Sequence, residues 1–253
     1  MITVAVANQK GGVSKTTTAH NLAAGLRDKG FRVLGVDLDP QGNFSDACGA
    51  QFKNVYSSYE VLKRTVGIRE AIQSLPRGYD FVPANTMLAG IEQQFSSELG
   101  KEFRLEECLA EVAAVYDYAV IDTPPSLGIL TVNALFAANQ IIIPTTARIF
   151  SASGIASFNE TVSAVKKYAH HPVEIRGILI TQFDSRANLN KQIRTLTERI
   201  GEHISAPVFS TCIRTGVAMA EAQANHTDIF DYNPKCTVAQ DYQAFINEFV
   251  GEV

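Results

Sequence analysis

The chain has 253 residues, of which 46% are hydrophobic and 19% carry a charged side chain. These proportions exclude a disordered or fibrous protein and predict a globular chain with a substantial core, within the length of one α/β domain. The formal net charge of −4 excludes a general attraction to DNA or to an anionic membrane, so any such contact requires a local basic patch.

Apolar runs and helical patterns alternate along the chain. A first strand is expected at residues 2–7, and a helix at residues 16–29 follows a loop with two glycines. Residues 42–94 are polar, and we interpret them as a switch region and connector. Further strands are expected at residues 32–36, 118–121, 140–143 and 175–180, and further helices at residues 59–64, 69–75, 105–116, 151–169, 188–200 and 238–250. This alternation predicts a single α/β domain, residues 1–253, with a mostly parallel central sheet flanked by helices on both faces.

Several features that the sequence lacks reduce the number of protein classes to which the chain could belong. The four cysteines form no C-x-x-C pair, which argues against a zinc site and a disulfide framework. No stretch reaches about eighteen uninterrupted apolar residues, and the first residues lack the basic start of a signal peptide, so we expect a cytoplasmic protein. Because the first strand begins at the second residue, we expect no N-terminal helix-turn-helix.

A glycine-rich loop with two lysines lies between the first strand and the helix that follows it. Its residues are Lys10, Gly11, Gly12, Val13, Ser14, Lys15, Thr16 and Thr17. Glycines let the backbone approach phosphate oxygens, and the N–H groups of the loop and of the helix start can surround them. Lys15 would neutralise the phosphates, and the hydroxyl of Thr16 would bind Mg²⁺. The alternative is a glycine turn without a ligand, for which these lysines and threonines have little packing use.

Three aspartates stand at the ends of predicted strands, where ligands of open α/β sheets bind. Asp37 and Asp39 belong to the sequence V-D-L-D-P after the second strand, and Asp122 ends a later apolar strand. Asp122 is suited to hold Mg²⁺ through water, as in a Walker B motif. Alone, Asp-x-Asp-Pro is equally consistent with a strand-ending turn. The order and spacing of the three motifs together indicate a nucleotide site.

The loop does not follow the pattern G-x-x-x-x-G-K-[ST], because Gln9 and Ser14 occupy its glycine positions. It resembles instead the deviant Walker A motif of P-loop NTPases in the ParA/MinD superfamily. Residues 81–85 and 179–186 extend the similarity, so nearly the whole chain resembles the short ParA/Soj-type partition ATPases. Ser14 occupies a position where these relatives commonly have glycine.

The resemblance implies ATP and Mg²⁺ as cofactors and an ATP-dependent homodimer, in which Lys10 reaches the nucleotide of the partner subunit. It implies that Asp39 positions the attacking water and that Asp37 supports the metal shell. The expected catalytic residues are therefore Lys10, Lys15 and Asp39, the metal residues are Thr16, Asp37 and Asp122, and the residues near adenine are Thr181, Asp184 and Ile213.

Non-specific double-stranded DNA is the track that the resemblance implies, and its binding depends on neutralising phosphates. Relatives carry two arginines near residue 214, of which Arg214 remains and the second is replaced by Ala218. We expect DNA contacts from Arg186, Lys191, Arg194 and Arg214. The alternative for each of them is a solvated surface charge.

Together these features predict an ATP-dependent dimerising switch that binds nucleoid DNA and positions or segregates a plasmid, a chromosome or a protein organelle. A ParB-like partner would stimulate its slow ATP hydrolysis. One alternative is a MinD-like membrane-positioning ATPase, but residues 240–253 contain three acidic residues and neither Lys nor Arg, so we expect no membrane partner. Another is a metal-cluster carrier related to the nitrogenase iron protein, for which suitably placed cysteines are absent.

Overall fold

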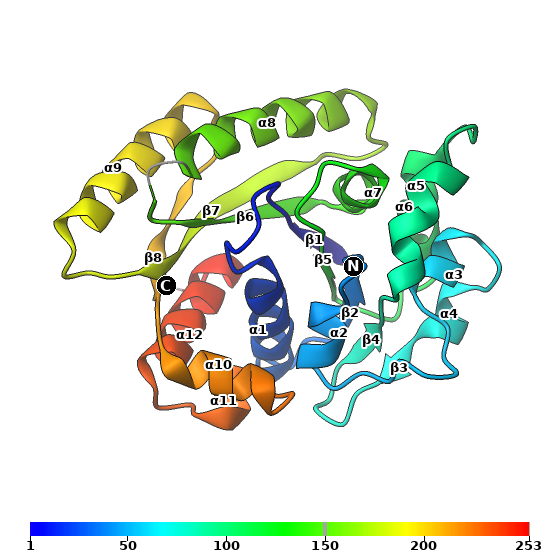
Figure 1. The fold of residues 1–253 in the computed structure, drawn as a ribbon, viewed down its shortest axis with the longest axis horizontal. Coiled ribbons are helices and arrows are strands. Elements are labelled where there is room, and N and C mark those ends of the chain that lie inside the picture. The colour runs from blue at the N-terminus through cyan, green and yellow to red at the C-terminus, as the bar shows by residue number, and fades with distance from the viewer. Residues whose placement is uncertain (149–150, 253) are drawn as a thin grey trace.

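A twisted sheet forms the centre of the structure, a computed structural model that describes residues 1–148 and 151–252 (Figure 1). Its strands are β1 (Ile2–Val6), β2 (Val33–Asp37), β3 (Gln73–Ser74), β4 (Asp80–Val82), β5 (Tyr118–Asp122), β6 (Gln140–Thr146), β7 (Glu174–Phe183) and β8 (Val208–Arg214). They lie side by side in the order β3-β4-β2-β5-β1-β6-β7-β8. β3 pairs antiparallel with β4, and the other neighbours pair in parallel.

Helices cover both faces of this sheet (Figure 1). One face carries α1 (Lys15–Asp28), α2 (Asn43–Ala47), α10 (Val217–Ala224), α11 (Ile229–Tyr232) and α12 (Thr237–Val250). The other carries α3 (Ser58–Leu62), α4 (Ile68–Ala71), α5 (Ile91–Gln94), α6 (Arg104–Ala110), α7 (Ile129–Ala137), α8 (Ser151–Tyr168) and α9 (Asn188–His203), with the 3₁₀ turns η1 (Thr86–Gly90) and η2 (Lys101–Phe103). Among the described helices, none combines the length and the apolar character needed to cross a bilayer.

Alternate residues of the central strand β1 enter two hydrophobic clusters. Val4 and Val6 pack in the cluster under α1 and α12, whereas Ala5 and Ala7 pack in the cluster under α7 and α8. A strand that is covered on both faces is apolar at most of its positions. The apolar run from Val4 to Ala7 follows from this double burial.

The parallel order brings the ends of three strands together. β1 lies between β5 and β6, and β5 lies between β1 and β2. Val6 is opposite Asp122 in the register of β1 and β5, and Asp37 is opposite Asp122 in that of β2 and β5. The glycine-rich loop after β1 and the two aspartates therefore lie at one edge of the sheet, where ligands of this architecture bind.

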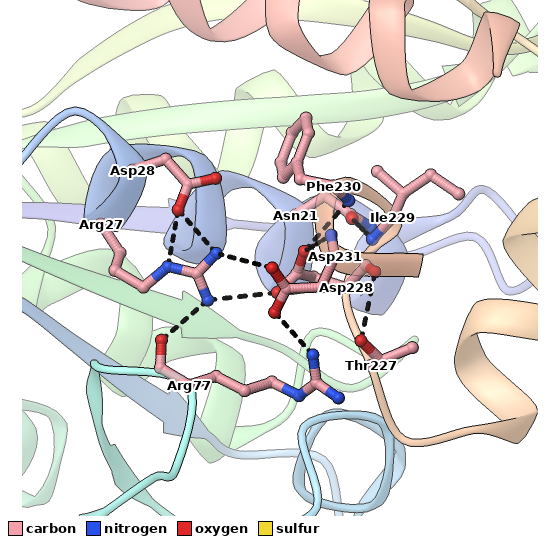
Figure 2. Close-up of polar contacts among 9 residues, drawn as sticks. All are labelled: Asn21, Arg27, Asp28, Arg77, Thr227, Asp228, Ile229, Phe230 and Asp231. Atoms are coloured by element: carbon pink, nitrogen blue, oxygen red, sulfur yellow. Dashed lines mark hydrogen bonds and ion pairs between the residues drawn. The ribbon is translucent and has the colours of Figure 1, made fainter. Parts of the chain in front are cut away.

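A partly buried network of charged side chains holds the far end of α1 (Figure 2). Arg27 donates from Nη1 to the carbonyl of Arg77 at 2.8 Å and to Oδ2 of Asp228 at 3.2 Å. The Asp228 side chain is fully buried and also accepts from the backbone N–H groups of Phe230 and Asp231 at the start of α11. Arg77 in turn pairs with Asp231 at 2.6 Å. The network joins α1, the turn before β4 and α11.

Two carboxylates of α12 bind backbone N–H groups of β8, the last strand of the sheet. Glu248 accepts from the N–H groups of Ser210 at 2.6 Å and Thr211 at 3.0 Å. Asp241 accepts from the N–H group of Arg214 at 2.9 Å. These donors are therefore satisfied by side chains of the same chain.

The expected elements are mostly confirmed, with shifted ends. β6 and β7 extend beyond the strands expected at residues 140–143 and 175–180. The helix expected at residues 105–116 is wrong after Ala110, because i→i+3 bonds such as Glu111 N–H to Cys108 C=O replace the α-helical ones. Val112 stays buried in this tighter winding, which explains the continued apolar spacing.

The helix expected at residues 69–75 is also wrong in its second half. α4 ends at Ala71, and Ile72 has an extended backbone. Gln73 and Ser74 pair with Phe81 and Asp80 as β3. A pairing with β4 therefore overrides the helical pattern in this connector.

Candidate nucleotide-binding site

The glycine-rich loop joins β1 to α1 and has a left-handed backbone at two positions. Gly12 has a φ of 71° and Ser14 a φ of 64°. Asn8 holds the start of the loop, since its Nδ2 donates to the carbonyl of Pro144 at 2.8 Å and its Oδ1 accepts from the N–H of Lys10 at 3.0 Å. The first N–H groups of α1 have no partner within the helix, so this end of the helix is suited to an anion.

A cavity of about 380 Å³ lies against this loop. The loop and the first turn of α1 form one side of it, and the segments after β2 and β5 form the other. Its lining consists of Gly11, Gly12, Ser14, Lys15, Thr16, Thr17, Asp39, Gln41, Asn43, Pro125 and Gln182. The structure thus brings Asp39 and six of the predicted loop residues together around one space, whereas Lys10 and Val13 do not line it.

Lys15 is largely buried at this cavity. Its Nζ donates to the carbonyl of Lys10 at 3.0 Å. Burial lowers the pKa of Lys15, while Asp122 and Asp39 act in the opposite direction. An anionic phosphate in the cavity would stabilise the charged form of this lysine.

Asp122 and Asp37 form a pair of fully buried carboxylates at the ends of neighbouring strands. Burial raises the pKa of Asp122 well above its usual range, with the charge of Asp37 adding to the effect. Burial likewise raises the pKa of Asp37 to about 6. The hydroxyl of Thr16 donates to Oδ2 of Asp122 at 2.6 Å and also reaches the cavity. The hydrogen bond from Thr16 and the positive charge of Lys15 act on the pKa of Asp122 in the opposite direction.

Mg²⁺ fits this arrangement. The Thr16 hydroxyl and the carboxylate behind it are hard oxygen donors, and Mg²⁺ is commonly held by one or two carboxylates together with phosphate oxygens and water. Within residues 1–148 and 151–252, no group of three or more His, Cys, Asp and Glu side chains is arranged to hold a metal ion. Nucleotide phosphates would therefore have to complete the coordination.

Asp37 and Asp39 occupy different places. Asp37 accepts from the N–H of Asp39 at 2.9 Å and from the N–H and hydroxyl of Ser45 at 2.9 and 2.7 Å. These bonds fix the turn after β2, so Asp37 lies behind the cavity and not in its lining. Asp39 lines the cavity, with its Oδ1 held by the N–H of Gln41 at 3.0 Å.

A second cavity, of about 270 Å³, adjoins the first on the α12 side. Ile213 lines it, together with residues of α10 and the end of β8. Thr181 and Asp184 do not line either cavity. The Thr181 hydroxyl lies beneath the loop, 3.2 Å from the carbonyl of Val13, and Asp184 is exposed beyond β7 beside Arg186. The structure therefore brings Ile213, but neither Thr181 nor Asp184, to the wall expected for adenine.

The four expected DNA contacts gather around the start of α9 and the end of β8. Phe183 is opposite Arg214 in the register of β7 and β8, which brings these two regions close. Three of the four form ion pairs: Arg186 with Asp184, Arg194 with Glu198, and Arg214 with Asp241. Lys191 is exposed on α9. Much of the positive charge here is balanced by carboxylates.

Comparison with known proteins decides the family. A family model described as an AAA domain matches residues 1–175. The chain is 36% identical over 249 residues to the chromosome partitioning protein ParA of Myxococcus xanthus, covering 98% of this chain and 87% of that protein. It is 36% identical over 241 residues to the sporulation initiation inhibitor protein Soj of Bacillus subtilis, covering 94% of each. The chain belongs to the ParA/Soj family of P-loop ATPases.

A solved structure shares the fold of this chain. A protein of Mycobacterium smegmatis described as cobyrinic acid a,c-diamide synthase, with bound ADP and magnesium, has a TM-score of 0.86 and 32% identity. The match covers 99% of this chain and 94% of that chain. The fold of this chain is therefore known for a protein whose structure was solved with ADP and magnesium.

Two glutamines of the site were not singled out by the sequence interpretation, although Gln182 lies between Thr181 and Asp184, which were. Gln182 lines both cavities and donates to the glycine-rich loop, and Gln223 on α10 donates to the hydroxyl of Thr17 at 3.0 Å. Gln182 precedes the last residue of β7, so the rule that ligands bind at the carboxyl ends of parallel strands could have identified it. Gln223 offers no comparable signal, because it stands on an ordinary helical pattern.

Proposed function

We propose that this chain is an ATP-driven switch that dimerises with ATP and Mg²⁺, binds DNA without sequence preference, and positions or segregates a cargo. The observation that carries the proposal is the convergence of Lys15, Thr16 and Asp39 on one cavity in a ParA/Soj-family chain. We assign the activity to a single P-loop domain, residues 1–253. Its place of action would be the cytoplasm, on nucleoid DNA.

We assign each residue at the cavity a separate role in ATP hydrolysis. Lys15 would neutralise the phosphates, and Thr16 would bind Mg²⁺, with Asp122 acting through water and Asp37 fixing the turn. Mg²⁺ would supply positive charge where negative charge develops on the phosphates. Asp39 would orient the attacking water from the opposite wall. Lys10 would act in the nucleotide site of the partner subunit.

The second cavity would receive the nucleobase. Ile213 supports this assignment directly, since it lines the cavity beside the first turn of α1. We propose that Thr181 contributes by supporting the loop from below, where it contacts the carbonyl of Val13. Asp184 would contribute through the exposed turn after β7.

DNA binding would depend on the cluster formed by Arg186, Lys191, Arg194 and Arg214. A net charge of −4 gives one chain no general attraction to DNA, so two copies in an ATP dimer would have to combine their clusters. A ParB-like partner would complete the site and accelerate an otherwise slow hydrolysis. The cargo would be set by that partner.

The test measures binding to random-sequence duplex DNA at fixed low salt with ATP, ADP or no nucleotide. We expect ATP alone to promote binding, Lys10→Ala to abolish it, Asp39→Ala to prolong it and Arg194→Ala to weaken it. Lys53→Ala removes an exposed lysine outside the site and serves as the matched control for charge. If the protein binds ATP yet ignores DNA in every state, the DNA part of the proposal is wrong and the ATP switch remains.

The same protein preparation tests two other functions. Binding to anionic liposomes only with ATP would favour a MinD-like membrane role instead of DNA. Because one solved relative is described as a cobyrinic acid a,c-diamide synthase, ATP turnover is also measured with and without DNA and with and without glutamine as an amide donor. Glutamine-dependent turnover that ignores DNA would contradict the partition role.

A further inference from the structure

Two neighbouring residues at the end of β7 hold three consecutive positions of the glycine-rich loop. The side-chain Nε2 of Gln182 donates to the carbonyl of Gly12 at 2.8 Å and to the hydroxyl of Ser14 at 3.3 Å. The hydroxyl of Thr181 lies 3.2 Å from the carbonyl of Val13 and 3.1 Å from the carbonyl of Thr145, so these two acceptors share its single proton. The loop is therefore bonded to β7 along its whole central part.

These bonds set the direction of backbone donors in the loop. In a planar trans peptide, the C=O and the N–H point in opposite directions. A fixed Gly12 carbonyl therefore fixes the N–H of Val13, and a fixed Val13 carbonyl fixes the N–H of Ser14. The N–H groups of such a loop are the donors that surround a bound phosphate. Gln182 and Thr181 thus determine how these two donors are presented.

Both partners of the Gln182–Ser14 contact have a strained backbone. Gln182 has a φ of 53° and Ser14 a φ of 64°, in the left-handed region that side chains other than glycine seldom adopt. Such conformations persist where surrounding contacts hold them. The hydrogen bond between the two side chains is a contact of this kind, and it gives the serine hydroxyl a partner at a position suited to glycine.

Gln182 also lies at the junction of the two cavities. Only three residues line both spaces among the described residues, namely Ser14, Thr17 and Gln182. A nucleotide with its phosphates in one cavity and its base in the other would pass these side chains. Gln182 could therefore act on phosphate binding, on base binding or on both.

We propose that Gln182 is a positioning residue for phosphate binding: its amide orients the N–H groups of the loop and accommodates the serine at position 14. The inference rests on the ATP site proposed above. The geometry favours phosphate over base recognition, because the shorter of its two bonds goes to the loop backbone. Gln182 then acts through the loop, as a group that prepares the site.

The experiment compares ATP with Mg²⁺-tripolyphosphate, which lacks ribose and base. Gln182→Met keeps the length of the side chain and removes both donors. We expect it to weaken the binding of both ligands by the same factor, about tenfold, as the loss of one or two hydrogen bonds predicts. In ATP hydrolysis, KM should rise while kcat stays within about twofold.

Gln223→Met is the matched control, since Gln223 lines only the second cavity and contacts the Thr17 side chain. It should weaken ATP binding and leave tripolyphosphate binding unchanged. Gln182→Gly removes the side chain but suits the left-handed backbone, so it provides a folded variant if Gln182→Met is unstable. Thermal unfolding without ligand identifies which variants are folded.

Tripolyphosphate affinity decides the outcome. If folded Gln182 variants bind it as tightly as the wild type does, the inference is wrong and Gln182 contacts only the ribose or base. If the wild type binds neither ATP nor tripolyphosphate, the proposed function itself fails. The two failures are therefore distinguishable in one titration series.

Discussion

Arg214 and Asp241 form a two-point ion pair, with Nη2 of the arginine 2.6 Å from Oδ1 and Nε 2.9 Å from Oδ2 of the aspartate. The backbone N–H of Arg214 donates to the same carboxylate at 2.9 Å. The guanidinium remains accessible to solvent, since 42% of the side chain is exposed. Its charge is nevertheless balanced within the chain, so it offers less to a DNA phosphate than an unpaired cation does.

We therefore predict that Lys191 contributes more to DNA affinity than Arg214 does. The double variant Arg214→Gln with Asp241→Asn removes the ion pair without changing the net charge, and its DNA affinity should stay close to that of the wild type. Lys191→Gln should weaken binding and reduce the slope of log affinity against log salt by about one. A salt titration with ATP measures both. Equal losses in the two variants would show that Arg214 contacts DNA directly.

The buried carboxylates at the metal site should cost stability in the absence of ligand. Asp122→Asn removes one of two neighbouring negative charges, and its amide can still bond Thr16 and the N–H of Thr123. We expect the free energy of unfolding without ATP and Mg²⁺ to rise by about 1 kcal/mol. Mg²⁺-dependent ATP hydrolysis should fall by about 10- to 100-fold.

Asp37→Asn is the control for this prediction. Both oxygens of Asp37 accept hydrogen bonds, so an amide nitrogen would face the donors of Ser45. This variant should lose about 1–3 kcal/mol of stability. Chemical denaturation with and without Mg²⁺-ATP separates the two variants. A loss of stability in Asp122→Asn would contradict the repulsion argument.

His20 should make stability depend on pH. It is almost fully buried on α1, and burial lowers its pKa from 6.5 to about 4, with Arg77 and Arg27 adding to the effect and Asp228 opposing it. The folded state binds this proton less readily than the unfolded state does. The neutral ring therefore makes its full contribution to the free energy of unfolding above pH 6.5. This contribution, about 3 kcal/mol in total, is lost as the pH falls toward 4.

His20→Leu has a similar volume and does not titrate. Urea unfolding of both proteins is measured between pH 7 and pH 4. As the pH falls, we expect the wild type to lose about 3 kcal/mol of stability relative to His20→Leu. Carboxylates titrate in both proteins, so the difference isolates the histidine. A constant difference across this range would contradict the lowered pKa.

Two of the three aspartates that pair with Arg27, Asp228 and Asp28, should differ in their effect on stability (Figure 2). Asp228 is fully buried and also caps α11, whereas 42% of the Asp28 side chain is exposed. Asp228→Ala leaves a largely buried arginine without one partner and should cost about 3 kcal/mol. Asp28→Ala should cost less than about 1 kcal/mol. Thermal unfolding of both variants measures the contrast, and equal costs would refute it.

The central strands and their motifs were predictable because burial on both faces leaves a continuous apolar run. Most of the cavity residues between Gly11 and Thr17, together with Asp39, followed from the loop and from strand ends. The structure is needed where contacts between residues far apart in the sequence determine the secondary structure. β3 exists because Gln73 pairs with Phe81, and the helical spacing after Ala110 hides a tighter turn.

Part of the site was beyond sequence reasoning for the same physical reason. Gln182 contacts Gly12 across 170 positions of sequence, and only the placement of β7 beside the loop reveals the bond. The pairing of Arg214 with Asp241 likewise depends on how α12 packs against β8. The sequence shows that a residue is basic, but it does not show which carboxylate pairs with it in the folded protein.

The contacts between α12 and β8 have a consequence for assembly. Exposed strand edges are where sheets of separate molecules join and grow into continuous ribbons. Here the amides of Ser210, Thr211 and Arg214 are already bonded to Glu248 and Asp241, and two negative charges stand beside the strand. An approaching strand would have to displace both carboxylates. The carboxylates of α12 therefore disfavour open-ended stacking of copies through β8.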